Sequence, residues 1–220
     1  MHDPPAHSGE ITDHAYMQAG GQLLSRGAAS QNHVPLLRPG HLTALTGSGL
    51  HRRKQYAAGL AHLYPRSSIR PIFWFTRYWT LPEIVKLLLA FQIDLDGPAA
   101  SENAAEQVAR AIDAVKRLRI HFETTHRSIT EVSARIERQP ANRLPRLIIV
   151  DGIEHFRASP EAYRSAAAIP AAIELLKDAA QRHEFALLIT CLPPTADWSD
   201  AVIAAASEVI AIKDDGIGEA

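Results

Sequence analysis

Short, continuously apolar runs recur along this 220-residue sequence, separated by longer segments with helical spacing. The clearest run is Leu147–Val150, which leads directly into Asp151 and lacks the alternating polar residues of a strand with one solvated face. Runs of this kind are buried on both sides, as in a parallel sheet that is covered by helices on both faces. The sequence therefore predicts an α/β fold with a mostly parallel sheet.

The predicted strands and helices alternate along the chain. Strands are expected at 41–46, 71–76, 119–123, 147–150, 186–190 and 209–212. Helices are expected at 53–63, 81–93, 101–118, 128–138, 160–183 and 199–206. Ser101 is the expected N-cap of the third helix, and a short helix is also expected around Leu23 and Leu24. Residues 1–19 are polar, with several His and Pro, and are expected to form a flexible tail before one domain over 20–220.

Composition and charge exclude several classes of protein. The formal net charge is −1, from 23 basic and 24 acidic residues, so no global positive field attracts nucleic acid or an anionic membrane. The only cysteine, Cys191, cannot form an internal disulfide and is expected to be a packed thiol, which favours a reducing compartment inside the cell. The histidines show no spacing typical of metal ligands, and we expect neither a metal site nor a membrane span.

A glycine-rich turn follows the first predicted strand, where nucleotide-binding α/β proteins carry a phosphate loop. Such a loop needs glycines that let backbone N–H groups approach phosphates, a lysine for the phosphate charge, and a Ser or Thr hydroxyl for Mg²⁺. Counted from Gly47, the place of the second glycine is taken by Arg52 and the place of the lysine by Arg53. The place of the Ser or Thr is taken by Lys54. The stretch is therefore either a degenerate phosphate loop or a tight strand-to-helix turn. Its residues are Gly47, Ser48, Gly49, Arg52, Arg53 and Lys54.

The strand Leu147–Val150 and its terminal acid have the pattern of a Walker B segment, in which a carboxylate at a strand end reaches Mg²⁺ through water. Asp151 is the predicted Walker B-like residue. Alternatively, Asp151 has a structural role only, such as accepting backbone hydrogen bonds from the loop after Thr190.

Several segments resemble, in order and spacing over residues 22–213, the eukaryotic RecA-family recombinase and its paralogues. The resemblance covers the glycine-rich loop with its helix, the second strand and helix, the Walker B strand leading to a first DNA-binding loop, the helix and strand leading to a second, and the closing helix and strand. The matching ranges are 23–61, 71–94, 147–157, 171–193 and 200–215. The resemblance implies a RecA-like core, with a mostly parallel sheet and helices on both faces.

One departure from RecA-type ATPases concerns the end of the second strand, where the family carries a Glu that polarises the attacking water. Here Arg77, Tyr78 and Trp79 follow Thr76, with no acid before Glu83. The resemblance therefore implies a pseudo-ATPase with no catalytic residues and no bound cofactor. The aromatic residues at this place belong either to the core or to a partner interface.

The ATPase motifs are degenerate, and no N-terminal helical DNA-binding domain is recognised. In both respects the sequence resembles the small paralogues that partner a SWIM-domain protein in the Shu complex. This implies a non-catalytic accessory subunit of a homologous-recombination complex that assists recombinase filament assembly on single-stranded DNA during DNA repair in the nucleus. The implied partners are a SWIM-domain or other recombinase-paralogue subunit, a recombinase, and DNA weakly or through the complex. Two alternatives remain: a weak RecA/DnaB/KaiC-type ATPase that binds ATP through an atypical loop, and a bacterial regulatory pseudo-ATPase that uses the fold as a protein interface.

The densest basic cluster is the turn His51–Lys54. Cations are unfavourable beside a helix N-terminus, so these residues either contact an anion such as DNA phosphate, act as internal cations in place of a nucleotide's Mg²⁺, or form a solvated helical turn. The candidate DNA-binding residues are Arg52, Arg53, Lys54, Arg157 and Arg164.

Overall fold

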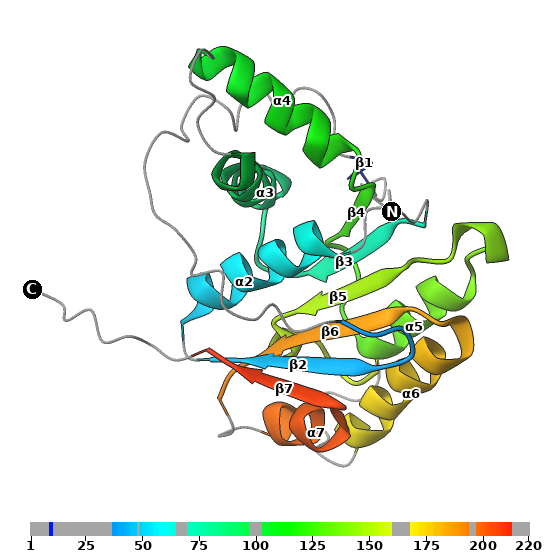
Figure 1. The fold of residues 1–220 in the computed structure, drawn as a ribbon. Helices are drawn as coiled ribbons and strands as arrows, with labels where there is room; N and C mark the ends of the chain where they lie inside the picture. Colours follow the sequence, from blue (N-terminus) through cyan, green and yellow to red (C-terminus); the bar gives the residue numbers. More distant parts are fainter. Residues whose placement is uncertain are drawn as a thin grey trace, which may run out of the picture.

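A seven-stranded sheet runs through the middle of the protein, with helices on both of its faces (Figure 1). The structure is a computed structural model, and it describes residues 9–10, 37–47, 49–64, 70–96, 103–159, 168–193 and 197–212. Six strands are parallel, and a two-residue strand pairs antiparallel at one edge. The strand order is β1-β4-β3-β5-β6-β2-β7. The predicted α/β architecture with a mostly parallel sheet is confirmed.

The strands are β1 (Gly9–Glu10), β2 (Leu42–Thr46), β3 (Ile72–Thr76), β4 (Ile120–Glu123), β5 (Leu147–Asp151), β6 (Ala186–Cys191) and β7 (Glu208–Ala211). The helices are α2 (Leu50–Leu63), α3 (Leu81–Asp96), α4 (Ala104–Lys116), α5 (Ile129–Glu137), α6 (Ala168–His183) and α7 (Asp197–Ala205). Two short 3-10 helices, η1 (Ala141–Arg143) and η2 (Ile153–His155), flank β5.

The central strands are buried on both faces because consecutive side chains enter two separate cores. Trp74 of β3 packs with α2 and α3 in one core, whereas its neighbours Phe73 and Phe75 pack with α5 and α6 in the other. In Figure 1, α2, α3 and α4 lie above the sheet and α5, α6 and α7 below it. This two-sided burial explains why the strands read as continuous apolar runs.

The structure moves two predicted helix starts by three residues: α2 begins at Leu50 instead of 53, and α4 at Ala104 instead of 101. The sequence reading used Ser101 as the N-cap of the third helix, but α4 begins at Ala104 and its N-cap is Asn103. The Asn103 side chain accepts a hydrogen bond from the Glu106 backbone N–H, and the Glu106 side chain accepts one from the Asn103 N–H. This reciprocal capping box satisfies two backbone N–H groups at the start of the helix.

Several predicted segments lie outside the described residues: the helix around Leu23 and Leu24, the first part of the 160–183 helix, and most of the 1–19 tail. Within that tail, Gly9 and Glu10 form β1 and pair with His121 and Phe122 of β4. Among the described helices, none is both long and apolar enough to cross a bilayer.

Candidate functional site

The candidate site lies at the carboxyl ends of β2, β3, β5 and β6, where parallel α/β sheets place their ligands. The turn after β2 is tightly packed. A Cβ on Gly47 would come within 3.1 Å of both the Cβ and the carbonyl oxygen of Ile212. The Ile212 N–H also donates to the Thr46 carbonyl at 2.7 Å. A side chain at position 47 would therefore require Ile212, beyond β7, to shift slightly, which is one reason for a glycine in this turn.

The helix α2 begins with the basic turn, and two of its cations are turned inward. Gly49 is the N-cap, and the first turn contains no acidic residue. Arg53 is only 1% exposed and Lys54 only 7% exposed. Because the N-terminus of a helix carries partial positive charge, burying two cations there requires compensation from elsewhere in the fold.

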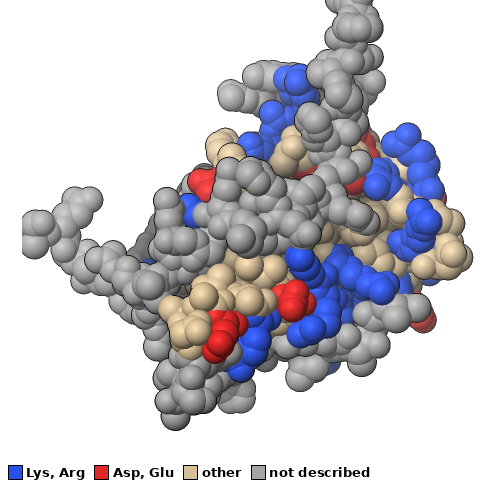
Figure 2. Space-filling view, turned by 90° about the horizontal axis from the view of Figure 1, so that it is seen from above, with Lys and Arg blue, Asp and Glu red and all other residues tan. Residues whose placement is uncertain are grey.

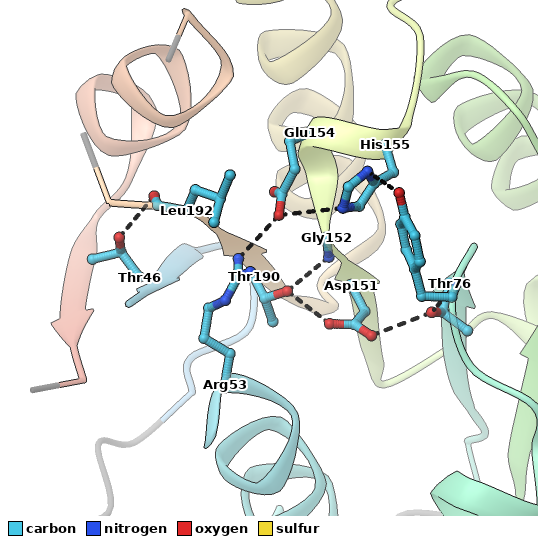
Figure 3. A network of polar contacts seen from close by, with 10 residues as sticks. Thr46, Arg53, Thr76, Asp151, Gly152, Glu154, His155, Thr190 and Leu192 are labelled. Atoms are coloured by element: carbon cyan, nitrogen blue, oxygen red, sulfur yellow. Dashed lines mark hydrogen bonds and ion pairs between the residues drawn. The ribbon is translucent and has the colours of Figure 1, made fainter. Parts of the chain in front are cut away.

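Glu154 supplies the compensation for Arg53. The Arg53 Nη1 donates to the Glu154 Oε1 at 3.2 Å, and both side chains are buried (Figure 3). Gly152, at φ 70°, makes the left-handed turn that ends β5 and starts η2, which directs Glu154 back over the strand ends. The same carboxylate oxygen lies 3.5 Å from the Nε2 of His155.

Lys54 is compensated differently, by an aromatic ring. Its Nζ lies 3.5 Å from the centroid of the Trp79 ring, in cation–π geometry. Burial lowers the pKa of Lys54 below its ordinary value, although the charges of Asp151 and Glu83 oppose this shift. Trp79 is itself buried, so this aromatic residue belongs to the core.

Asp151 is buried at the end of β5 between two hydroxyl groups. Thr190 Oγ1 donates to its Oδ1 at 2.8 Å, and Thr76 Oγ1 donates to its Oδ2 at 3.2 Å (Figure 3). Thr190 in turn accepts the Gly152 N–H at 2.7 Å. Burial raises the pKa of Asp151 above its ordinary value, against the opposing effects of both hydroxyls and Lys54. The carboxylate thus connects three strands, through side-chain hydroxyls instead of the backbone donors suggested as its structural partners.

Tyr78 and His155 form a second polar pair beside this network. The Tyr78 hydroxyl is hydrogen-bonded to the His155 Nδ1, and the two rings meet edge to face. Tyr78 is 51% exposed, so it is the aromatic residue of this strand end that reaches the surface. Burial lowers the pKa of His155, although the nearby Glu154 opposes the shift.

The structure separates the predicted DNA-binding residues into three groups. Arg53 and Lys54 are buried, which corrects their assignment as DNA contacts and favours the alternative of internal cations. Arg52 is half-buried on α2, and Arg157 is exposed after η2. Arg164, Ser48 and the His51 side chain lie outside the described residues. Among the four described candidates, two are buried, one is half-buried and one is exposed.

Sequence reasoning missed Glu154, Thr190 and the Tyr78–His155 pair. The available signal for Glu154 was its position, three residues after Asp151, opposite a basic turn that needed an anion. Thr190 gave no signal, since a threonine at the end of an apolar run is common in strands. Cys191 was read correctly as a packed thiol: it is buried, and burial raises its pKa to about 11.

The surface carries both signs of charge. On the face shown in Figure 2, Lys and Arg occur in several groups with Asp and Glu among them. This distribution agrees with the formal net charge of −1 and provides no uniform positive field.

No protein-family model and no curated protein matches the chain. Solved structures do match its fold. The ATPase domain of G40P has a TM-score of 0.63 at 12% identity, covering 83% of this chain and 72% of that one. A DnaB-like replicative helicase, described with its interactions with primase, has a TM-score of 0.65 at 11% identity, covering 84% of this chain and 50% of that one. The RadB recombinase has a TM-score of 0.50 at 14% identity, covering 80% and 75%.

These structural matches establish the fold of the chain. The chain has the RecA-type NTPase fold, as the resemblance to recombinases implied. At these identities the likeness establishes the fold alone, since one fold hosts many functions. The narrower likeness to Shu-complex subunits, and the nuclear location that came with it, stay predictions.

Proposed function

We propose that this chain is a non-hydrolysing, RecA-like accessory subunit of a homologous-recombination complex that assists recombinase filament assembly on single-stranded DNA. The observation that supports its inertness is the Arg53–Glu154 ion pair. A cation and an anion of the chain itself are paired, at 3.2 Å, at the strand ends where this fold class binds ligands.

The donor set at the strand ends does not fit a magnesium nucleotide. Mg²⁺ prefers oxygen ligands, and the position expected to supply a Ser or Thr hydroxyl holds Lys54. Both Asp151 oxygens accept hydrogen bonds from threonines, so this carboxyl has partners within the chain, and burial raises its pKa. Beyond β3, the residues that follow Thr76 are Arg77 and Tyr78, neither of which is a base for an attacking water at neutral pH.

The proposed partners come from the resemblance to the Shu-type paralogues. A subunit without hydrolysis of its own acts through others, so we propose a stable complex with a SWIM-domain or other recombinase-paralogue subunit. The regulatory pseudo-ATPase alternative shares the inert site but has no recombination partner. Affinity purification of the tagged full-length chain from its native cell distinguishes the two, because recovery of a recombinase or its paralogue supports only the first.

ATP turnover by the purified full-length protein tests the inert site. We expect phosphate release at background level, with no difference between the unaltered chain and Asp151→Ala. We also expect no binding of a fluorescent ATP analogue with Mg²⁺, because Arg53 and Lys54 occupy the surroundings of Asp151. Turnover above background that is lost in Asp151→Ala would establish the weak-ATPase alternative instead.

A matched variant shows whether the ion pair itself opposes nucleotide binding. Glu154→Gln removes the charge partner of Arg53 and keeps the shape of the side chain. Binding of the analogue by Glu154→Gln but not by the unaltered chain would support an internally neutralised site. Arg143→Gln, an exposed change on η1 at the opposite end of the strands, is the control for nonspecific effects.

A further inference from the structure

The polar network at the strand ends reaches the surface at a tyrosine that is bonded to a histidine. Tyr78 is 51% exposed, and its hydroxyl is hydrogen-bonded to the Nδ1 of His155. On the other side of the imidazole, the Nε2 lies 3.5 Å from the Oε1 of Glu154 (Figure 3). A hydroxyl that is bonded to a base, with a third group orienting that base, is the arrangement of an activated nucleophile.

The carboxylate of Glu154 determines which nitrogen of His155 carries the proton. A carboxylate accepts hydrogen bonds and does not donate them, so the proton of the neutral ring is on the Nε2 that faces Glu154. The Nδ1 then has a free lone pair and accepts the hydrogen bond that the Tyr78 hydroxyl donates. In this tautomer His155 is positioned to take the phenol proton.

The backbone on both sides of this bond is fixed by the same network. The Tyr78 N–H donates to the Thr76 Oγ1 at 3.4 Å, and that hydroxyl donates to Asp151. The His155 N–H donates to the Gly152 carbonyl at 2.9 Å, within the turn that follows β5. A nucleophile and a base that are held in place before a substrate arrives lose little entropy in the reaction.

The charges around His155 favour its neutral form. They come from Arg53 and Lys54 of α2, Arg77 after β3, and Glu154 of η2. Burial has the largest effect and lowers the pKa of His155; the three cations lower it further, and Glu154 opposes them. A neutral imidazole can accept a proton at neutral pH. The charge of Arg77 also favours the negative charge that develops on a carbonyl oxygen under attack.

We propose that Tyr78 is a nucleophile for acyl transfer from activated carboxylic esters, with His155 as the proton acceptor and Glu154 as the positioning residue. The Tyr78 Oη attacks the carbonyl carbon of the ester while its proton moves to the Nδ1 of His155. The bond from that carbon to the leaving oxygen then breaks, the leaving oxygen takes the proton from His155, and the acyl group stays on Tyr78 as an ester. The step consumes no ATP, so it goes beyond the proposed function and is tested independently of it.

Acetylation of the full-length protein by p-nitrophenyl acetate at neutral pH tests this site, with peptide mass spectrometry to measure the rate at each tyrosine. Tyr56, on α2, is 38% exposed and lies outside the network, so it is an internal control. We expect Tyr78 to be acetylated roughly 100-fold faster than Tyr56, since a positioned general base contributes about 100-fold to 10,000-fold. This comparison needs no substituted protein. Equal rates at the two tyrosines would overturn the proposal.

Matched variants identify the base. His155→Gln should slow the acetylation of Tyr78 roughly 100-fold and leave the rate at Tyr56 unchanged. Tyr78→Phe should remove the fast release of p-nitrophenol that accompanies the first acetylation. Arg143→Gln, an exposed change at the amino end of the sheet, should alter neither rate. Circular dichroism of every variant verifies that the fold is intact.

The pH profile tests the positioning role of Glu154. The rate at Tyr78 should rise with pH through the pKa of His155 and then level off, because His155 must be neutral to accept the proton. Glu154→Gln removes the charge that raises this pKa, so the rise should move to lower pH. Arg77→Gln removes a charge that lowers it, so the rise should move to higher pH. A rate that climbs without a plateau toward about pH 10, as for a phenol without a base, would contradict the role of His155.

The outcomes separate this nucleophile from the proposed function. If Tyr78 reacts no faster than Tyr56, or if His155→Gln has no effect on it, the nucleophile is rejected and the inert ATPase core stands. Acetylation of His155 itself in place of Tyr78 would also reject it. If ATP is hydrolysed while Tyr78 reacts as expected, the proposed function fails and the nucleophile stands.

Discussion

At the scale of single residues, Asp151 has the position of a metal-binding acid but the surroundings of a structural one. Its two oxygens accept hydrogen bonds from Thr190 and Thr76, and burial raises its pKa. A carboxyl that is costly to ionise is retained where its hydrogen bonds join neighbouring strands, here β3, β5 and β6.

We expect Asp151→Asn to raise the free energy of unfolding at neutral pH, because burial disfavours the ionised carboxyl and the amide does not ionise. Because the pKa of Asp151 is higher in the folded than in the unfolded chain, its contribution to stability is complete below the unfolded pKa. This contribution is lost as the pH rises through the folded pKa. The amide avoids this loss, so its advantage should disappear in acid, near the ordinary carboxyl pKa of 3.8. Urea unfolding of both proteins across this pH range measures the effect.

The control for this prediction is Thr190→Val, which removes one donor to Asp151 and the acceptor of the Gly152 N–H. Leaving these buried groups unpaired should cost about 1 to 3 kcal/mol. A lower stability of Asp151→Asn than of the unaltered chain at neutral pH would contradict the assignment of a buried carboxyl with a raised pKa.

At the scale of elements, α4 illustrates how a helix start depends on local side chains. The helix packs against α3 through Ala111 and Val115, and its opposite face is exposed. The capping box of Asn103 and Glu106 therefore helps to fix where α4 begins and stabilises its first turn.

Asn103→Ala should destabilise the protein by about 1 kcal/mol, because it removes the acceptor for the Glu106 N–H. Asn103→Asp should be tolerated, since aspartate caps helices equally well. Faster amide hydrogen exchange in the first turn of α4, together with a lower midpoint of urea unfolding, is the expected observation. If Ser101→Ala has the larger effect, the original assignment of the N-cap was right.

At the scale of the whole molecule, Arg70 joins segments that are far apart in the sequence. It precedes β3 at the amino end of the sheet and donates to the carbonyls of Pro145 at 2.6 Å, His183 at 2.9 Å and Leu144 at 3.1 Å. These carbonyls belong to the approach to β5 and the end of α6. Together with a contact to the Glu184 carbonyl at 3.4 Å, one guanidinium therefore reaches four acceptors that regular secondary structure leaves open.

Arg70→Gln should lower the free energy of unfolding by about 2 to 3 kcal/mol, since hydrogen bonds from a charged donor are worth more than neutral ones. Arg70→Lys should recover only part of this loss, because an ammonium cannot reproduce the planar fork of the guanidinium. Arg143→Gln, on the nearby η1, should change the free energy by less than about 0.5 kcal/mol. Equal effects of Arg70→Gln and Arg143→Gln would refute this account.

The order of strands and helices was predictable because a strand that is buried on both faces is apolar at nearly every position. Runs such as Leu147–Val150 must be apolar throughout when helices cover both sides of a parallel sheet. The boundaries of most described elements followed within a few residues for the same reason. The N-cap of α4 did not, because Ser101 and Asn103 are equally good caps until the path of the backbone is known.

The fold class, the position of the glycine-rich turn and the acid at the end of β5 all follow from the amino-acid sequence alone. The partners of the charged side chains become known only from the folded structure. From the sequence, a solvated or DNA-binding turn was one interpretation of Arg53 and Lys54. In the structure Arg53 is buried against Glu154, and Lys54 is buried against Trp79. The physical reason is that apolar periodicity is a local property of a chain. The pairing of a charge depends on residues about a hundred positions apart, which only the packing of β2, β5 and α2 brings together.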